Sequence, residues 1–196
     1  MDVCRAFDDS LVAAIELNIS CPNVKKGGME FGNDPEMSAQ VVESCRKVTA
    51  KPIITKLSPN QADIQLNAKL CIEAGTDALA VINTISGLAI DIDKKELVLG
   101  NRAGGLSGPA IKPIALKKVY DVYQVSKKHG VPIMGQGGIS SPEDAIEFIL
   151  AGATTVGVGT ALFFDPLICN KINQGLETYL RANGLSSLDD LVGGLV

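Results

Sequence analysis

Two short stretches near the carboxyl end decide the fold: VPIMGQGG at residues 131–138 and TTVGVGT at residues 154–160. Each contains a short apolar run that passes into a glycine-rich turn. Apolar runs without polar alternation are typical of parallel strands covered on both faces. Glycine turns after the last two strands, where backbone N–H groups can converge on a phosphate, are typical of barrels of alternating strands and helices. The two stretches therefore favour the final part of a barrel.

Similar apolar runs occur earlier in the chain, at Ala13 to Ile19, Pro52 to Leu57 and Ala78 to Asn83. Between them lie helical patterns with capping residues at their starts, such as Asp34 before Pro35, and glycines at their ends. Strands that alternate with helices predict a parallel sheet. The predicted helices are Pro35 to Val48, Asp63 to Ala74, Ile111 to Lys128, Ser141 to Leu150, Leu167 to Ala182 and Ser187 to Leu191.

Five strands are compatible with an open doubly wound sheet or with part of a (β/α)8 TIM barrel. The first predicted strand is not followed by Gly-x-Gly-x-x-Gly, which weakens a dinucleotide-binding interpretation. A complete barrel has about 250 residues, whereas this chain has 196. Residues Asp2 to Ser10 resemble the end of a helix whose preceding strand is missing. We therefore expect a partial barrel, in which residues 1–196 supply the carboxyl-terminal five βα units of one α/β domain.

The composition excludes several classes of protein. Hydrophobic residues make up 46% of the chain, so it is not disordered, and a net charge of −4 does not favour nucleic-acid binding. There is no apolar run of transmembrane length and no signal-peptide pattern, so we expect a cytoplasmic protein without membrane contact. The five cysteines are scattered without a Cys-x-x-Cys pair, which argues against a disulfide framework or a metal site on this chain.

The segment from Glu16 to Asn23, ELNISCPN, contains the first candidate chemical groups. Cys21 follows a predicted strand and could act as a thiolate nucleophile or base. Asn18 and Asn23 carry amides suited to the edge of a planar ring. The alternative is an inert cysteine beside turn-forming asparagines. The only histidine, His129, lies at the predicted end of a helix, so a Cys-His hydrolase is nearly excluded.

Polar residues also lie at the ends of two further strands. Lys56 lies within an apolar strand, and lysine is rarely buried there unless it is paired or functional; it could also extend from an edge strand into water. Asn83 and Thr84 end the next strand, where they could bind a ligand or form an ordinary turn. Glycine-rich turns at residues 104–109, 136–139 and 157–161 predict a mononucleotide phosphate site, although each turn alone is a weak signal.

These motifs, in this order and spacing, resemble those of the class 1 dihydroorotate dehydrogenases, most closely the NAD-linked 1B catalytic subunit. The resemblance covers essentially the whole chain, but members of that family begin earlier, with a segment that carries three more strands. It implies an FMN-containing TIM barrel that oxidises dihydroorotate to orotate in pyrimidine biosynthesis. It also implies a partner subunit carrying FAD and a 2Fe–2S cluster, and a homodimer.

The resemblance assigns a role to each candidate residue. Cys21 is expected to be the base that takes the C5 proton of dihydroorotate, and Lys56 to face the N1 side of the flavin. Asn18, Asn23, Asn83 and Thr84 are expected to bind the substrate, and Asn18 to contact the flavin as well. The remaining expected FMN contacts are Ile82, Gly108, Gly137, Gly138, Gly159 and Thr160.

Two alternatives to this function stay open. One is a related flavin-dependent dihydropyrimidine dehydrogenase, although the residues after Cys21 resemble the dihydroorotate enzymes more. The other is a catalytically silent barrel fragment, because five strands cannot close a barrel. We expect that the 196-residue chain by itself does not turn over dihydroorotate.

Overall fold

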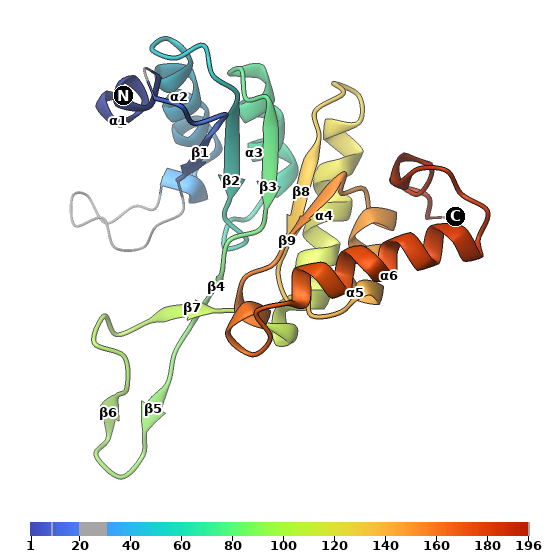
Figure 1. Ribbon diagram of the computed structural model, residues 1–196. Coiled ribbons are helices and arrows are strands. Elements are labelled where there is room, and N and C mark those ends of the chain that lie inside the picture. Colours follow the sequence, from blue (N-terminus) through green and yellow to red (C-terminus); the bar gives the residue numbers. More distant parts are fainter. Residues whose placement is uncertain (9, 20–30, 196) are drawn as a thin grey trace.

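The computed structural model describes residues 1–8, 10–19 and 31–195 (Figure 1). Its centre is a five-stranded parallel sheet with the strand order β1-β2-β3-β8-β9. The strands are β1 (Ile15–Asn18), β2 (Ile53–Leu57), β3 (Ala78–Val81), β8 (Ile133–Gln136) and β9 (Thr155–Gly157). They coincide with the five predicted strands. Each observed strand is shorter than the apolar run that predicted it.

Helices connect successive strands, as the sequence predicts. They are α1 (Asp2–Asp8) before β1, α2 (Pro35–Arg46), α3 (Ile64–Glu73), α4 (Lys112–Ser126), α5 (Pro142–Leu150) and α6 (Ile168–Ala182). Helices α2, α3 and α4 pack in sequence along the sheet, and α5 packs against α6. Short 3-10 turns occur at Phe31–Asn33, Pro109–Ile111, Thr160–Phe163 and Leu188–Asp190. Among the residues that the structure describes, no helix is both long and apolar enough to cross a membrane.

The helix starts arise from local capping. The Asp34 carboxylate accepts a hydrogen bond of 2.9 Å from the backbone N–H of Met37, and Asp63 accepts one of 2.9 Å from Leu66. These bonds satisfy N–H groups that have no partner within the first turn of a helix. The predicted stop at Gly75 is also confirmed, because this residue follows α3 with a φ of 98°, a conformation that favours glycine.

The two faces of the sheet differ in burial. On β2, Ile53, Thr55 and Leu57 are buried, whereas Ile54 and Lys56 are partly exposed. The same alternation occurs on β1 and β8. Since successive side chains of a strand point to opposite faces, one face packs against the helices and the other is the face that would line the interior of a barrel. Strands β1 and β9 form the two edges of this sheet, so the described residues do not close a barrel.

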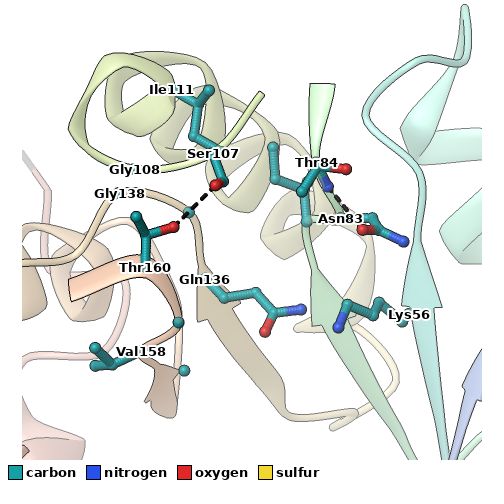
Figure 2. Close-up of a pocket in the computed structure, with 14 residues that line it drawn as sticks. Lys56, Asn83, Thr84, Ser107, Gly108, Ile111, Gln136, Gly138, Val158 and Thr160 are labelled. Carbon is teal, nitrogen blue, oxygen red and sulfur yellow. Dashed lines mark hydrogen bonds between the residues drawn. The ribbon is translucent and has the colours of Figure 1, made fainter. Parts of the chain in front are cut away.

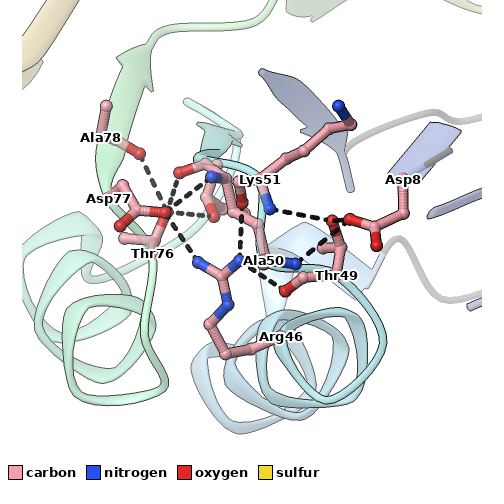
Figure 3. Close-up of polar contacts among 10 residues, drawn as sticks. Asp8, Arg46, Thr49, Ala50, Lys51, Thr76, Asp77 and Ala78 are labelled. Atoms are coloured by element: carbon pink, nitrogen blue, oxygen red, sulfur yellow. Dashed lines mark hydrogen bonds and ion pairs between the residues drawn. The ribbon is translucent and has the colours of Figure 1, made fainter. Parts of the chain in front are cut away.

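A polar network ties together the amino-terminal ends of β2 and β3, opposite the ends that carry the candidate site (Figure 3). The Arg46 guanidinium contacts the Asp77 carboxylate at 2.8 Å, and donates to the carbonyls of Thr49 at 2.7 Å and Lys51 at 2.6 Å. Asp77 also accepts a bond of 2.7 Å from the N–H of Ile53. One arginine therefore connects α2 to the chain that enters β2 and to the start of β3.

The segment from Ile85 to Leu106 forms an arm that the sequence analysis did not predict. Strand β4 (Ile85–Gly87) pairs antiparallel with β7 (Gly104–Leu106), and β5 (Ile90–Asp91) pairs with β6 (Glu96–Leu97). The arm extends away from the main sheet (Figure 1). The glycines at 104 and 105, which we had assigned to a turn, lie in β7. Strands of two or three residues are too short to show a periodic pattern, which explains the omission.

Candidate active site at the carboxyl ends of the strands

A cavity of about 310 Å³ lies at the carboxyl ends of the sheet strands (Figure 2). In α/β folds this end of the strands is where ligands bind. The cavity is lined by Lys56, Ile82, Asn83, Thr84, Ser107, Gly108, Ile111, Gln136, Gly137, Gly138, Gly157, Val158, Gly159 and Thr160.

The structure brings most of the predicted site residues to this one cavity. Lys56, Ile82, Asn83 and Thr84 come from the middle of the sheet, and the predicted glycines and Thr160 come from the loops that follow. Asn18 does not line the cavity but is joined to it, because its side-chain oxygen accepts a hydrogen bond of 3.1 Å from the Asn83 amide. The predicted residues Cys21 and Asn23 lie outside the described residues.

The amides at one side of the cavity are held by further hydrogen bonds. The Asn83 side-chain oxygen accepts a bond of 2.8 Å from the N–H of Thr84. Asn60 donates to the Thr84 carbonyl at 3.2 Å and accepts from the N–H of Ser86 at 2.9 Å. The turn after β3 is thus fixed at both ends, and Asn83 serves both as a turn residue and as a link to Asn18. Asn60 was not among the predicted residues.

Lys56 extends from β2 on the face opposite the helices, as its alternation with buried neighbours requires. Its ammonium contacts the carboxylate of Glu16 on β1 at 3.2 Å, and both side chains are partly exposed. Glu16 keeps the lysine in place while its own negative charge partly offsets the cation. Glu16 was not among the predicted site residues. Its signal was available, since Glu16 and Asn18 share one face of the same strand.

The glycine loops fit closely against one another. Gly108 and Gly138 have φ values of 86° and 83°, which favour glycine. A Cβ atom on Gly138 would lie only 2.7 Å from the Gly108 carbonyl oxygen, whereas one on Gly159 would meet nothing within 4 Å. Thr160 donates to Ser107 at 2.9 Å or accepts from it, joining the loop after β9 to the loop after β7. Glycine at 138 therefore permits close backbone packing, and Gly159 leaves space free.

These loops expose backbone donors. Among the described residues, the N–H groups of Gly138 and Gly159 donate to no backbone carbonyl. A second cavity of about 220 Å³ adjoins the first and shares Gly108, Gly138, Gly159 and Thr160 with it. Unpaired N–H groups that converge from two loops are suited to the oxygens of a phosphate.

A charged cluster supports the loop after β8. Lys112 contacts Asp144 at 2.7 Å and Glu147 at 3.0 Å, and Asp144 also accepts bonds of 2.8 Å and 2.9 Å from the N–H and hydroxyl of Ser140. Burial raises the pKa of Asp144, but the hydrogen bonds from Lys112 and Ser140 outweigh burial and hold this pKa below its ordinary value. The hydrogen bonds of Lys112 to Asp144 and, second, to Glu147 raise the pKa of Lys112. This cluster was not predicted, because Lys112 lies 32 positions from Asp144 and 35 from Glu147 along the chain.

Two cysteines in the described part of the chain, Cys45 and Cys71, are held in the thiol form at neutral pH. Cys4, Cys45 and Cys71 are free and buried, and Cys169 is free and exposed. Burial raises the pKa of Cys71 to about 12, and burial together with the nearby Cys4 raises that of Cys45 to about 11. His129 is exposed after α4, as expected.

Comparison with known proteins agrees with this arrangement. The family model for dihydroorotate dehydrogenase matches residues 1–180. The chain belongs to the dihydroorotate dehydrogenase family. It is 54% identical over 184 residues to the protein named dihydroorotate dehydrogenase B (NAD(+)), catalytic subunit, from Pelobacter propionicus, covering 94% of this chain and 60% of that relative. The protein of the same name from Geotalea daltonii is also 54% identical over 184 residues, covering 94% of this chain and 59% of that relative.

Solved structures of DHODH from Eimeria tenella share the fold. The complex with ferulenol has a TM-score of 0.79 at 22% identity, covering 98% of this chain and 57% of the solved chain. The ligand-free form has the same TM-score at 23% identity, covering 97% and 58%. The prediction of a partial TIM barrel is therefore confirmed. The chain spans about 60% of the length of the curated relatives that it matches.

Proposed function

We propose that residues 1–196 are the carboxyl-terminal part of a single FMN-binding TIM-barrel domain, the catalytic subunit of a B-type dihydroorotate dehydrogenase. The observation that carries this proposal is the single cavity that joins a fixed cation, Lys56, to the Asn83 and Thr84 turn and to the glycine loops. A cation, an amide edge and a phosphate cradle are the groups needed to hold a flavin mononucleotide against a pyrimidine substrate.

The residues present fit FMN. Among the described residues, the N–H groups of Gly138 and Gly159 donate to no backbone carbonyl, so they can serve as donors for the phosphate, and the space beside Gly159 leaves room for it. Gly137 and Thr160 complete this end, while Ile82 and Gly108 provide surfaces for the ring. FMN, when bound, supplies the acceptor for the hydride that leaves C6 of dihydroorotate. Lys56 places a positive charge beside the ring, where it stabilises the negative charge of reduced flavin.

The substrate side of the proposal rests on amides and on one thiol. Asn18, Asn83 and Thr84 present donors and acceptors that match the edge of a pyrimidine, and Asn23 is proposed to complete this set. Cys21 is proposed to take the C5 proton of dihydroorotate as a thiolate base. Loss of this proton and of the C6 hydride yields orotate.

The partner proteins and location follow from the family and stay proposals. The relatives are named as catalytic subunits of an NAD(+) enzyme, which supports an electron-transfer partner subunit carrying FAD and a 2Fe–2S cluster. We further propose a homodimer in the cytoplasm. The described residues hold no cluster of three or more His, Cys, Asp or Glu side chains that could bind a metal. The iron–sulfur centre is proposed to lie on the partner subunit, as the resemblance to the 1B enzymes implies.

The test uses what we call the completed protein, in which the amino-terminal segment of the Pelobacter propionicus relative precedes this chain. Purified completed protein should contain FMN, and dihydroorotate should bleach the flavin absorption without oxygen, whereas dihydrouracil should not. Bleaching by dihydrouracil alone would indicate a dihydropyrimidine dehydrogenase instead. Absence of bound flavin would contradict the proposal.

A silent fragment is the second candidate, and one observation favours it. Among the described residues, strands β1 and β9 are the unpaired edges of the sheet, and the face that carries Lys56 is partly exposed. If the protein functions only as these 196 residues, the edges must be covered by another chain for the cavity to close.

A further inference from the structure

The side chain of Gln136 lines the cavity and has no role in the assignments above. It is the last residue of β8, and its carbonyl accepts a hydrogen bond of 3.0 Å from the N–H of Ile82, which holds its backbone against β3. Its amide nitrogen Nε2 is buried and has no hydrogen-bond partner among the described residues. Buried donors are satisfied in the great majority of native structures, so an unsatisfied one needs an explanation.

The two ends of the Gln136 amide have different surroundings. A Cβ atom on Gly157 would lie 2.9 Å from the Gln136 oxygen Oε1, so the glycine on neighbouring β9 makes room for this side chain. Figure 2 shows the Gln136 amide and the Lys56 ammonium pointing toward one another across the floor of the cavity. The ammonium has donors only, and its carboxylate partner Glu16 lies on β1, on the other side of β2 from β8. Among the described residues, the Gln136 amide nitrogen therefore has no acceptor on the side that faces the Lys56 ammonium.

We propose that Gln136 and Lys56 form a two-donor site for one hydrogen-bond acceptor of the bound ligand, a carbonyl oxygen or ring nitrogen of a planar heterocycle. Apolar Ile82 and Val158 line the same cavity and suit the faces of such a ring, whereas the unpaired backbone donors at the glycine loops suit the phosphate. On the proposed function, on which this inference rests, the acceptor belongs to the pyrimidine portion of the flavin ring. Gln136 then positions the flavin ring and influences the midpoint potential of bound FMN.

The test compares Gln136→Met and Gln136→Glu in the completed protein, with Gln65→Met, at an exposed position of α3, as the control. Gln136→Met keeps the length of the side chain but removes the donor, so FMN should bind about fivefold to tenfold more weakly, as for the loss of one hydrogen bond. The carboxylate introduced by Gln136→Glu pairs with Lys56 and offsets its charge, so the midpoint potential of bound FMN should become more negative. The control should change neither quantity.

Stability without FMN separates this role from a structural one. Because Gln136→Met removes an unsatisfied buried donor, the FMN-free variant should unfold at the same temperature as the unmutated protein or at a higher one. Equal FMN affinity of Gln136→Met and the unmutated protein overturns the two-donor site but leaves the proposed function intact. Failure of the unmutated completed protein to bind FMN overturns both.

Discussion

Lys56 on β2 donates a hydrogen bond of 3.2 Å to Glu16 on β1, and the two residues are not register partners, because Lys56 lies opposite Asn18. The lysine therefore reaches diagonally along the inner face of the sheet toward a carboxylate. This pair fixes the direction of the cation and, at the same time, moderates its electrostatic effect on a ligand in the cavity.

Substitutions at this pair should shift the midpoint potential of bound FMN in opposite directions. Lys56→Ala removes the cation that stabilises reduced flavin, so the potential should become more negative. Glu16→Gln removes the opposing anion but keeps a hydrogen-bond acceptor, so the potential should become more positive. A redox titration of the completed protein measures both, and an unchanged potential in Lys56→Ala would mean that Lys56 does not act on the flavin.

Cys21→Ser in the completed protein should slow flavin reduction by dihydroorotate by at least about 100-fold at neutral pH. A serine hydroxyl is a much poorer base than a thiolate, and general-base catalysis contributes on the order of 100-fold or more. Stopped-flow absorption measures the rate. Cys169→Ser, at an exposed cysteine of α6, is the matched control and should leave the rate unchanged. A Cys21→Ser rate near that of the control would remove Cys21 from the mechanism.

The ion pairs and hydrogen bonds of Asp144 should make the free energy of unfolding depend on pH in the acidic range. The folded pKa of Asp144 lies below its ordinary value of 3.8, so its contribution is fully present above that value and is lost as the pH falls through the folded pKa. The pKa of Lys112 is raised, so its contribution to stability is present below about pH 10.5 and is lost as the pH rises through the folded pKa. Denaturant unfolding of Asp144→Asn between pH 5 and 2 should show a smaller loss of stability than the unmutated protein. Equal slopes would contradict the assignment.

Arg46→Met should lower the free energy of unfolding by about 1–3 kcal/mol, because it leaves the carbonyls of Thr49 and Lys51 and the Asp77 carboxylate without this donor. Arg181→Met is the matched control, since the partner of Arg181 among the described residues is exposed Glu177 on the same helix, and its loss should change stability by less than about 0.5 kcal/mol. Urea unfolding measures both. FMN affinity should not change in either variant, because Arg46 lies at the opposite end of the strands.

The 196-residue chain alone should not turn over dihydroorotate. In the described part of the chain the edges at β1 and β9 are unpaired and the face that carries Lys56 is partly exposed, so we expect a bound ring to be exposed to water and poorly oriented, and hydride transfer depends steeply on orientation. The phosphate end is present, so weak FMN binding is expected. Purified chain is mixed with FMN, and bleaching by dihydroorotate is followed without oxygen. Stoichiometric FMN with rapid bleaching would show that five strands suffice.

The sequence by itself determined the succession of strands and helices. Signals within a few residues of each other decide these elements, such as the cap at Asp34 and the glycine after the predicted helix that ends at Ala74, and the apolar runs need no partner to be recognised. The same local signals predicted Lys56, Asn83 and the glycine loops near the carboxyl ends of the strands, and all parallel strands end at one edge of the sheet. The boundaries were less certain: the run Ala13 to Ile19 contains only four strand residues, Ile15–Asn18.

Only the tertiary structure decided which side chains meet. Two contacts of the site join residues that are 40 or more positions apart: Lys56 with Glu16, and Asn83 with Asn18. The lack of a partner for the Gln136 amide nitrogen among the described residues likewise depends on which strands lie next to β8. Such contacts follow from strand order and register, which local sequence does not encode. The arm from Ile85 to Leu106 has the same origin, since its strands of two or three residues are held by cross-strand pairing rather than by any periodic pattern.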